Sequence, residues 1–301
     1  MLTRQKIILH LINQRGEASR LQLVKWAFIL AQSSRSPKLR TFYKFVPYKY
    51  GPFSFGLYHE IETLIRNGYL LESSNTLKLN DGIAIPAIDL PLKRELYLFA
   101  IKYDRLSEKE LIHYVYSNNP WFTVNAIQFG TRVENRPEAK PAVYTVGYEG
   151  LQVDGLLNLL LREGIQRLID VRHNPVSRRY GFHKSTLSSL CQKLDIEYEH
   201  VPELGIPSES RANLHHPRDY QMVFEQYEKN ILPKHPASVE KVVAWTKARA
   251  SVLLCMEVDP KLCHRTRLAR QVSKKTGLAV CDLREEVCDT HIPEREFSLR
   301  L

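Results

Sequence analysis

The chain has 301 residues, of which 44% are hydrophobic, and a formal net charge of +10. This length and apolar content favour two globular domains over a disordered chain. No apolar run approaches the roughly 20 residues that a membrane span needs, and the N-terminus, charged throughout, does not resemble a secretory signal. With five cysteines, an odd number, we expect a cytoplasmic protein with reduced thiols and no membrane partner.

The positive charge is concentrated near the N-terminus. The first 50 residues hold ten lysines and arginines but one acid, Glu17. Such an excess favours an acidic partner, DNA first, although a solvated basic face with no partner has the same composition. The cations expected to contact nucleic acid are Arg35, Lys38, Arg40, Lys44 and Lys49.

Residues 1–90 are expected to form an α+β module of three helices and a hairpin. The helical signals are apolar spacing, a cap at Ser19 and a stop at Gly68. The pattern predicts helices at 6–12, from 19 onward and at 55–67, an extended segment at 42–50, and a β-hairpin at 69–79.

This order of elements is typical of a winged helix. The stretch FYKFVPYKYGPFSFGLYHEIETLIRNGYL resembles the winged-helix module of SocA-like antitoxins, which share a Tyr-Gly-Pro-Ser turn. A recognition helix normally supplies Arg and Lys to DNA, but the third helix here carries Glu60 and Glu62 with only Arg66. The resemblance therefore implies contact with the DNA backbone, or with a protein partner, rather than sequence-specific readout.

Residues 91–140 are expected to be a helical connector and linker. An amphipathic helix reaches Tyr103, and Ser107 with Glu110 forms a capping box for a second helix. The polar, proline-containing segment 132–141 is the expected linker.

Residues 141–301 are expected to form a Rossmann-like α/β domain, a parallel sheet with helices on both faces, because strand-like and helical runs alternate. The expected strands are 143–146, 167–171, 197–201, 251–255 and 278–282, and the expected helices are 153–163, 184–194, 218–231, 237–249 and 264–276. Ligands bind beyond the carboxyl ends of such strands. This rule places the loop at Gly147 and the segments 170–179 and 255–265 on one rim.

Several motifs in this half resemble one known family. YTVGYEG, LIDVRHNPVSRRYGF, IEYEHVPELG and LLCMEVDPKLCHRTRLA are similar, in order, to the family catalogued as domain of unknown function 488. The resemblance runs from about Ala142 to Ala279, and the charged tail from Asp282 departs from it. It implies a small α/β domain with a nucleic-acid-associated role such as base processing, and winged-helix modules occur fused to this family.

Two carboxylates on the rim, Asp170 and Glu257, are candidates for acid–base or water-activating work, as in glycosidic hydrolysis. Arg172 would lie on the same side of the strand as Asp170 and keep its pKa low, or form a structural ion pair with it. Tyr148, Tyr180 or Phe182 could stack a flipped base. The groups expected to hold substrate or phosphate are Gly147, Tyr148, Arg172, Ser177, Arg178, Phe182, His264 and Arg265.

Cys255 and Cys263 offer a different chemistry. Cys263 precedes a helix start, where a thiolate is stabilised, although neither cysteine is followed by the Gly- and Arg-rich loop of rhodaneses or tyrosine phosphatases. Zinc bound by both cysteines and His264 is not expected, since the spacing matches no known finger and adjacent ligands are awkward. We therefore expect no metal and no cofactor.

The leading prediction is an enzyme that hydrolytically processes or removes a normal or modified DNA base. The basic N-terminal module would hold the polymer and the rim would hold the site. One alternative is a thiol-dependent sulfur transferase or phosphatase that uses Cys255 or Cys263. The other is a winged-helix regulator without catalysis that responds to a ligand at the rim.

Overall fold

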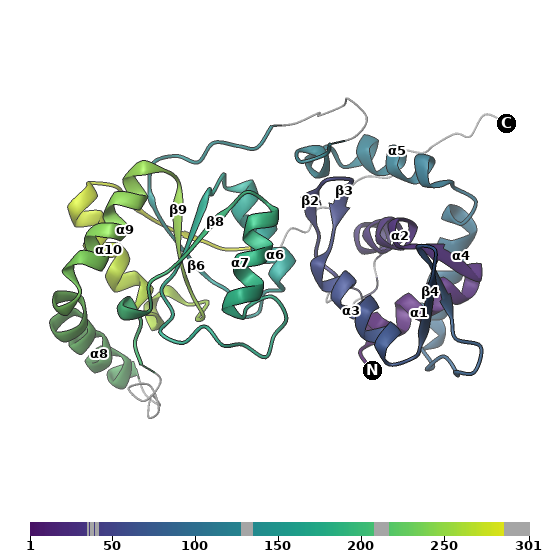
Figure 1. Ribbon diagram of the computed structural model, residues 1–301, viewed down its shortest axis with the longest axis horizontal. Helices are drawn as coiled ribbons and strands as arrows, with labels where there is room; N and C mark the ends of the chain where they lie inside the picture. The colour runs from purple at the N-terminus through teal and green to yellow at the C-terminus, as the bar shows by residue number, and fades with distance from the viewer. Residues whose placement is uncertain (35, 37–38, 40–41, 128–134, 208–216, 286–301) are drawn as a thin grey trace.

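The computed structural model describes residues 1–34, 36, 39, 42–127, 135–207 and 217–285 (Figure 1). An N-terminal module of helices and small antiparallel sheets lies beside a C-terminal α/β domain. The α/β class of the second domain is confirmed, and the N-terminal part is compatible with α+β.

The N-terminal module begins with helices whose predicted signals are present. Its helices are α1 (Thr3–Arg15), α2 (Arg20–Ser33) and α3 (Phe55–Arg66). Its strands are β1 (Glu17–Ser19), β2 (Val46–Tyr48), β3 (Gly51–Phe53), β4 (Leu70–Ser73) and β5 (Thr76–Leu79). The side chain of Ser19 accepts a hydrogen bond from the backbone of Gln22, as a helix cap does. The predicted hairpin is confirmed as β4–β5, and β1 pairs with β5 to complete a three-stranded sheet.

The turn between β2 and β3 is held by a buried lysine. Lys25 of α2 is 2% exposed and its Nζ donates to the carbonyls of Tyr50 and Pro52. Gly51 has φ +86°, and a Cβ there would lie 2.6 Å from the Tyr116 ring, so this position needs glycine. Burial lowers the pKa of Lys25 to about 7, so the lysine loses part of its ordinary positive charge at neutral pH.

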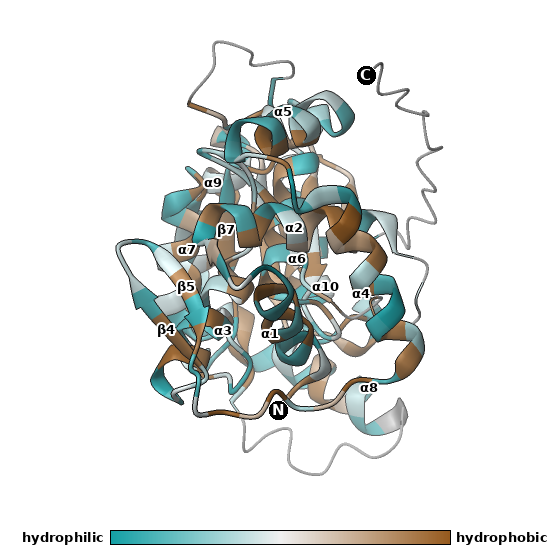
Figure 2. Cartoon of the chain, turned by 90° about the vertical axis from the view of Figure 1, so that its right-hand side faces the viewer, coloured by the Kyte–Doolittle hydropathy of each residue, from teal (hydrophilic) through white to brown (hydrophobic). Residues whose placement is uncertain are grey.

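The segment predicted as a connector packs into the same core as the N-terminal module. It contains α4 (Leu90–Tyr103), α5 (Glu108–Asn118) and a short 3-10 turn (Pro120–Thr123). The predicted capping box of α5 is present at Ser107. Figure 2, which views the molecule from the side of this module, shows helices with both hydrophilic and hydrophobic residues, as expected of helices with one buried face.

The C-terminal domain is built on a five-stranded parallel sheet with the order β10-β6-β9-β7-β8. Its strands are β6 (Val143–Gly147), β7 (Arg167–Asp170), β8 (Glu197–His200), β9 (Ser251–Cys255) and β10 (Val280–Leu283). Its α-helices are α6 (Val153–Arg162), α7 (Lys184–Lys193), α8 (Pro217–Gln226), α9 (Pro236–Ala248) and α10 (Arg265–Thr276). The helix expected at 218–231 ends earlier as α8 and continues as a π-helical turn, Tyr227–Ile231.

Helices cover both faces of this sheet, and successive residues of β9 enter different cores. Val252 and Leu254 pack with α6 and α7, whereas Leu253 packs with α8, α9 and α10. This alternation is the two-residue period of a strand buried on both sides. The carboxyl ends of β6, β9 and β7 therefore meet at one edge, with β9 between the other two.

The two parts are joined at a buried carboxylate. Asp154, in the first turn of α6, is fully buried and accepts hydrogen bonds from Phe55 N (2.8 Å), Gly56 N (2.9 Å) and Ser54 Oγ (3.1 Å) at the start of α3. The first N–H groups of a helix lack partners within it, and the carboxyl of Asp154 supplies acceptors for them. Nearby, the rings of His59 and Tyr180 stack with centroids 4.0 Å apart.

None of the helices in the described part of the chain combines the length and the apolar character that crossing a membrane requires.

Candidate functional site

Two thiols, an imidazole and a carboxylate converge at the carboxyl end of β9. The Sγ atoms of Cys255 and Cys263 lie 3.1 and 3.0 Å from the same oxygen, Oε2 of Glu257. Nδ1 of His264 lies 3.7 Å from Cys255 Sγ. Both cysteines are 1% exposed and His264 is 3% exposed. We call Cys255, Glu257, Cys263 and His264 the thiol cluster.

The orientation of His264 is fixed by the neighbouring strand. Its Nε2 lies 3.1 Å from the carbonyl oxygen of Val171, which can only accept a hydrogen bond. Nε2 therefore carries a proton, and in the neutral ring Nδ1 presents its lone pair to Cys255. Burial would lower the pKa of His264, but its contacts with Cys263 and with the Val171 carbonyl outweigh this and raise the pKa above its usual value.

The net pKa shifts of Cys263 and Glu257 are opposite, although burial acts to raise the pKa of both. Burial raises the pKa of Cys263 well above the usual range, and the neighbouring Cys255 acts in the same direction. It would also raise the pKa of Glu257, but hydrogen bonds from Cys263 and Cys255 favour the carboxylate and bring the pKa below its usual value. At neutral pH Glu257 is thus a carboxylate, and Cys263 beside it is a thiol.

Arg265 holds the loop that carries Glu257 in place through hydrogen bonds to its backbone. This arginine is fully buried, and its guanidinium donates to the carbonyls of Glu257 and Val258 and to Asp282. The sequence suggested Arg265 as a phosphate ligand. In the structure its donors face the protein, so it positions the Glu257 loop.

Gly147, at the end of β6, is a close-approach position. A Cβ on it would lie 1.9 Å from the carbonyl oxygen of Glu257 and 2.9 Å from Val258 Cα. Only glycine lets the loops after β6 and β9 touch, so its role is to admit the Glu257 backbone.

Replacing Gly147 with alanine is expected to displace the Glu257 loop. We expect the free energy of unfolding to fall by about 1–3 kcal/mol, as for other overpacked sites, and the two cluster thiols to react faster with an aromatic disulfide reagent. Chemical denaturation and thiol titration measure both effects. Gly82→Ala is the control, because the nearest atom to its Cβ is 4.0 Å away; equal effects of the two substitutions would contradict the close-approach role.

Asp170 and Arg172 form a buried ion pair, as the sequence suggested. Arg172 Nε and Nη2 bond to the two carboxylate oxygens of Asp170 at 2.8 and 2.5 Å, and Tyr198 donates to one of them at 2.7 Å. The second Nη of Arg172 donates to the Tyr148 hydroxyl and to the Phe182 carbonyl. Asp170 is 0% exposed and Arg172 is 5% exposed. The pair is therefore already satisfied by protein groups, which is the structural role weighed above.

The two aromatic residues expected to stack a base stack on each other instead. Tyr148 and Phe182 have ring centroids 4.3 Å apart and nearly parallel planes, and both are buried. Tyr180 stacks on His59 of α3. Of the remaining predicted rim groups, Arg178 is exposed, while Ser177 is half-buried and accepts a hydrogen bond from Arg179 N.

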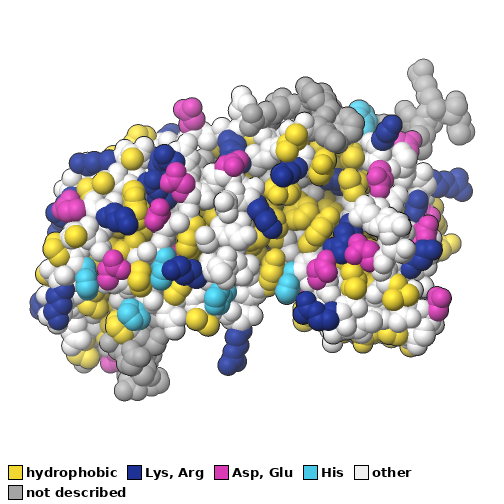
Figure 3. Space-filling model, in the orientation of Figure 1, with side chains coloured by type: hydrophobic (Ala, Val, Ile, Leu, Met, Phe, Trp, Pro, Cys, Tyr) yellow, Lys and Arg dark blue, Asp and Glu magenta, His cyan; other side chains and the backbone are white. Residues whose placement is uncertain are grey.

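The N-terminal cations are more fully paired than the sequence implied. Arg4 pairs with Glu60, Arg15 with Asp104, and Arg20 with Glu62 and Glu72. Lys44 pairs with Glu285, and Lys49 lies over the Tyr48 ring. The other predicted nucleic-acid contacts, Arg35, Lys38 and Arg40, lie outside the described residues. On the face drawn in Figure 3, Lys and Arg side chains are interspersed with Asp and Glu.

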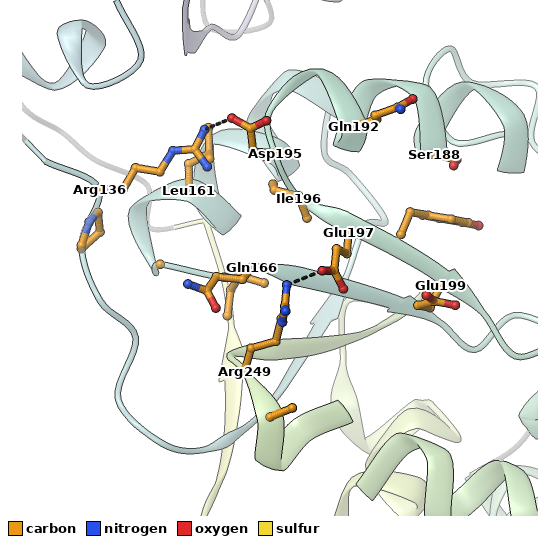
Figure 4. A pocket seen from close by; sticks show the side chains of 15 residues that line it. Arg136, Leu161, Gln166, Ser188, Gln192, Asp195, Ile196, Glu197, Glu199 and Arg249 are labelled. Carbon is orange, nitrogen blue, oxygen red and sulfur yellow. Dashed lines mark hydrogen bonds and ion pairs between the residues drawn. The ribbon is translucent and has the colours of Figure 1, made fainter. Parts of the chain in front are cut away.

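A polar groove of about 930 Å³ opens at the opposite end of the sheet, where β7 and β8 begin (Figure 4). Four of its charged groups form ion pairs: Arg136 with Asp195 at 3.5 Å, and Arg249 with Glu197. The groove contains no member of the thiol cluster. It therefore adds no group to the chemistry at the rim.

Two contributors to the region were missed from the sequence. Tyr198, on β8, bonds to Asp170, and His200 lies 2.9 Å from the carbonyl oxygen of Arg172. The alternation of β8 could have indicated them, since Tyr198 and His200 lie two residues apart on the same side of a strand that ends at the rim. A zinc site was not expected from Cys255, Cys263 and His264 because of their spacing, but their ligand atoms lie within 4.8 Å of one another.

Comparison with known families confirms the resemblance of the C-terminal half. Residues 152–272 match the family model described as "Domain of unknown function DUF488". The match covers β7, β8, β9 and the whole thiol cluster, but not β6. Comparison of the chain with curated proteins and with solved structures gives no match in either set.

Proposed function

We propose that this chain is a hydrolytic enzyme that removes or processes a DNA base at the carboxyl edge of its parallel sheet. Its residues 152–272 resemble the family named above. The proposal is carried by one observation: Glu257 is an ionised carboxylate on the rim that accepts hydrogen bonds from two thiols. Asp170, the other candidate, has both oxygens bound to Arg172. Glu257 is therefore our candidate acceptor for a proton from water.

The surroundings of Glu257 suit a planar substrate. Met256 and Val258, on either side of it, are each 48% exposed and offer apolar surface for a base. In the reaction, water would lose a proton to Glu257 as its oxygen bonds to C1′ of the sugar. The C1′–N bond would break, and the base would leave with the bonding electrons and take up a proton. Met256, Val258 and exposed Arg178 would contact the nucleotide.

A thiol enzyme is the second candidate, supported by the 3.7 Å separation of Cys255 Sγ and His264 Nδ1. A histidine at this distance can take a proton from a thiol. The raised pKa of Cys263 and the burial of both sulfurs count against a reactive thiolate. A substrate adduct on Cys255 or Cys263, found by mass spectrometry, would favour this candidate.

The test is turnover of labelled single- and double-stranded DNA that contains normal or modified bases, resolved with and without alkali. We expect alkali-labile sites with the wild-type chain, and a rate at least about 100-fold lower with Glu257→Gln, as for loss of a general base. Glu163→Gln, an exposed carboxylate at the end of α6, is the matched control and should leave the rate unchanged. DNA binding without any product would contradict the proposal and favour the regulator.

A further inference from the structure

The thiol cluster has the composition of a transition-metal site. Two sulfurs and one imidazole nitrogen lie within 4.8 Å of one another in a buried position. Thiolate and imidazole are the ligands that select Zn²⁺ over Mg²⁺ or Ca²⁺. Buried cysteines are also common as ordinary core residues. The geometry of the three side chains distinguishes a metal site from such packing.

We propose that Cys255 Sγ, Cys263 Sγ and His264 Nδ1 bind one Zn²⁺ ion, and that the fourth position of the metal faces the Glu257 carboxylate. This site goes beyond the proposed function, because metal binding requires neither DNA nor turnover. The proposed function enters only in a further step, in which Glu257 would accept a proton from water at the fourth position of the metal.

The separation of Cys255 and His264 is close to that of two ligands of a tetrahedral centre. With Zn–S of about 2.3 Å and Zn–N of about 2.0 Å, a tetrahedral angle puts sulfur and nitrogen about 3.5 Å apart. The observed Cys255 Sγ to His264 Nδ1 distance is 3.7 Å. All three ligand atoms lie within 4.8 Å of one another.

The backbone explains how adjacent residues can share one metal. Cys263 is extended, with φ −132° and ψ 136°, whereas His264 is helical, with φ −63° and ψ −23°. The change from extended to helical backbone between them lets both side chains reach the end of β9. Sequence spacing alone does not reveal such a bend.

The hydrogen bond of His264 to the backbone is of the kind that metal-bound histidines make. Zinc-binding histidines usually donate their other ring N–H to a carbonyl or carboxylate, which fixes the tautomer. His264 does this with the Val171 carbonyl at 3.1 Å, so Nδ1 offers a lone pair to the thiol side. The Tyr227 ring packs edge-on against the imidazole at 5.4 Å and limits its rotation.

Charge also favours a dication here. Each thiol now donates a proton toward Glu257 Oε2. Zn²⁺ would replace these two protons, and two thiolates balance its charge. Glu257 could then accept a hydrogen bond from water on the metal in place of those from the thiols, and the buried Arg265 guanidinium would still hold its loop in place.

The experiment measures metal on the full chain without DNA. Protein is stripped with a chelator under reducing conditions and dialysed against Zn²⁺, and bound metal is then measured by mass spectrometry. We expect one zinc per chain. Cys255→Ser, Cys263→Ser and His264→Asn should each weaken Zn²⁺ binding at least about 100-fold, since even outer-shell changes cost 10–100-fold.

The matched controls are Cys191→Ser, a buried thiol on α7, and Cys281→Ser, an exposed thiol on β10; both should keep the zinc. Glu257→Gln should keep it too, and loss as complete as with the cysteines would overturn the three-ligand assignment. If the ligand variants fail to fold, as judged by circular dichroism, the absorption spectrum of the wild-type chain with added Co²⁺ tests the site instead. Sulfur-to-cobalt charge transfer and tetrahedral d–d bands are expected, and their absence, or no bound zinc, would overturn the site.

Discussion

Asp170→Ala is expected to lower the free energy of unfolding of the C-terminal domain by about 3–5 kcal/mol, the usual cost of removing one partner of a buried ion pair. The substitution leaves the Arg172 guanidinium 5% exposed without its carboxylate. It also removes the acceptor of Tyr198 and of the Arg172 backbone N–H. Urea unfolding followed by circular dichroism measures the change.

The control for this prediction is Tyr198→Phe, which removes one hydrogen bond to Asp170 and should cost about 1 kcal/mol. The double variant Asp170→Ala/Arg172→Met should be more stable than Asp170→Ala alone, because no charge is then left buried. A loss below about 1 kcal/mol for Asp170→Ala would mean that the pair contributes little. The expected loss also makes Asp170→Ala a poor test of catalysis, which is why Glu257→Gln is preferred.

The junction at Asp154 is expected to be more stable at pH 4 than at pH 7. Burial raises the pKa of Asp154 from 3.8 to about 6, against the hydrogen bonds from Gly56, Phe55 and Ser54. Between these values the folded state keeps a proton that the unfolded state has lost. Raising the pH therefore removes stability, by up to about 3 kcal/mol.

The measurement is the difference in unfolding free energy between wild type and Asp154→Ala across this range. We expect the difference to fall as the pH rises from 4 to 6, and to stay level above 7. Ser54→Ala removes one hydrogen bond to the same carboxylate but leaves it titratable, so this control should keep the decline. A difference that rises with pH would show that the hydrogen bonds to the carboxylate outweigh its burial.

The helices and most strands could be predicted because their signals are local. Ser19 caps α2 and Ser107 caps α5, and the five strands of the parallel sheet follow apolar runs. β1 was missed because three residues become a strand only through pairing with β5, about 60 residues later. The packing of α4 and α5 into the core of the N-terminal module was missed because an amphipathic pattern shows that one helix face is buried, but not which element covers it.

The site was predicted to the level of the rim but not to its contacts. The rule for parallel sheets brought Asp170, Glu257 and Cys255 to one edge. The alternation of side chains along a strand already indicated that Asp170 and Arg172 could pair. The contact of Glu257 with two cysteines depends on side-chain packing, and only the structure shows it. Asp154 gave no signal beyond an acid in the first turn of a helix, where such residues are common.

The stack of His59 on Tyr180 is a contact through which the two halves of the chain can be coupled. Tyr180 belongs to the loop that leaves the rim at Arg172, and Gly181 in the same loop packs against Val153 of α6. A ligand that orders this loop in one conformation would favour one placement of α3. By reciprocity, a partner that binds the N-terminal module and moves α3 must change the affinity of the rim by the same factor. Communication between the modules by this route would pass through one aromatic contact and would depend on the position of α3.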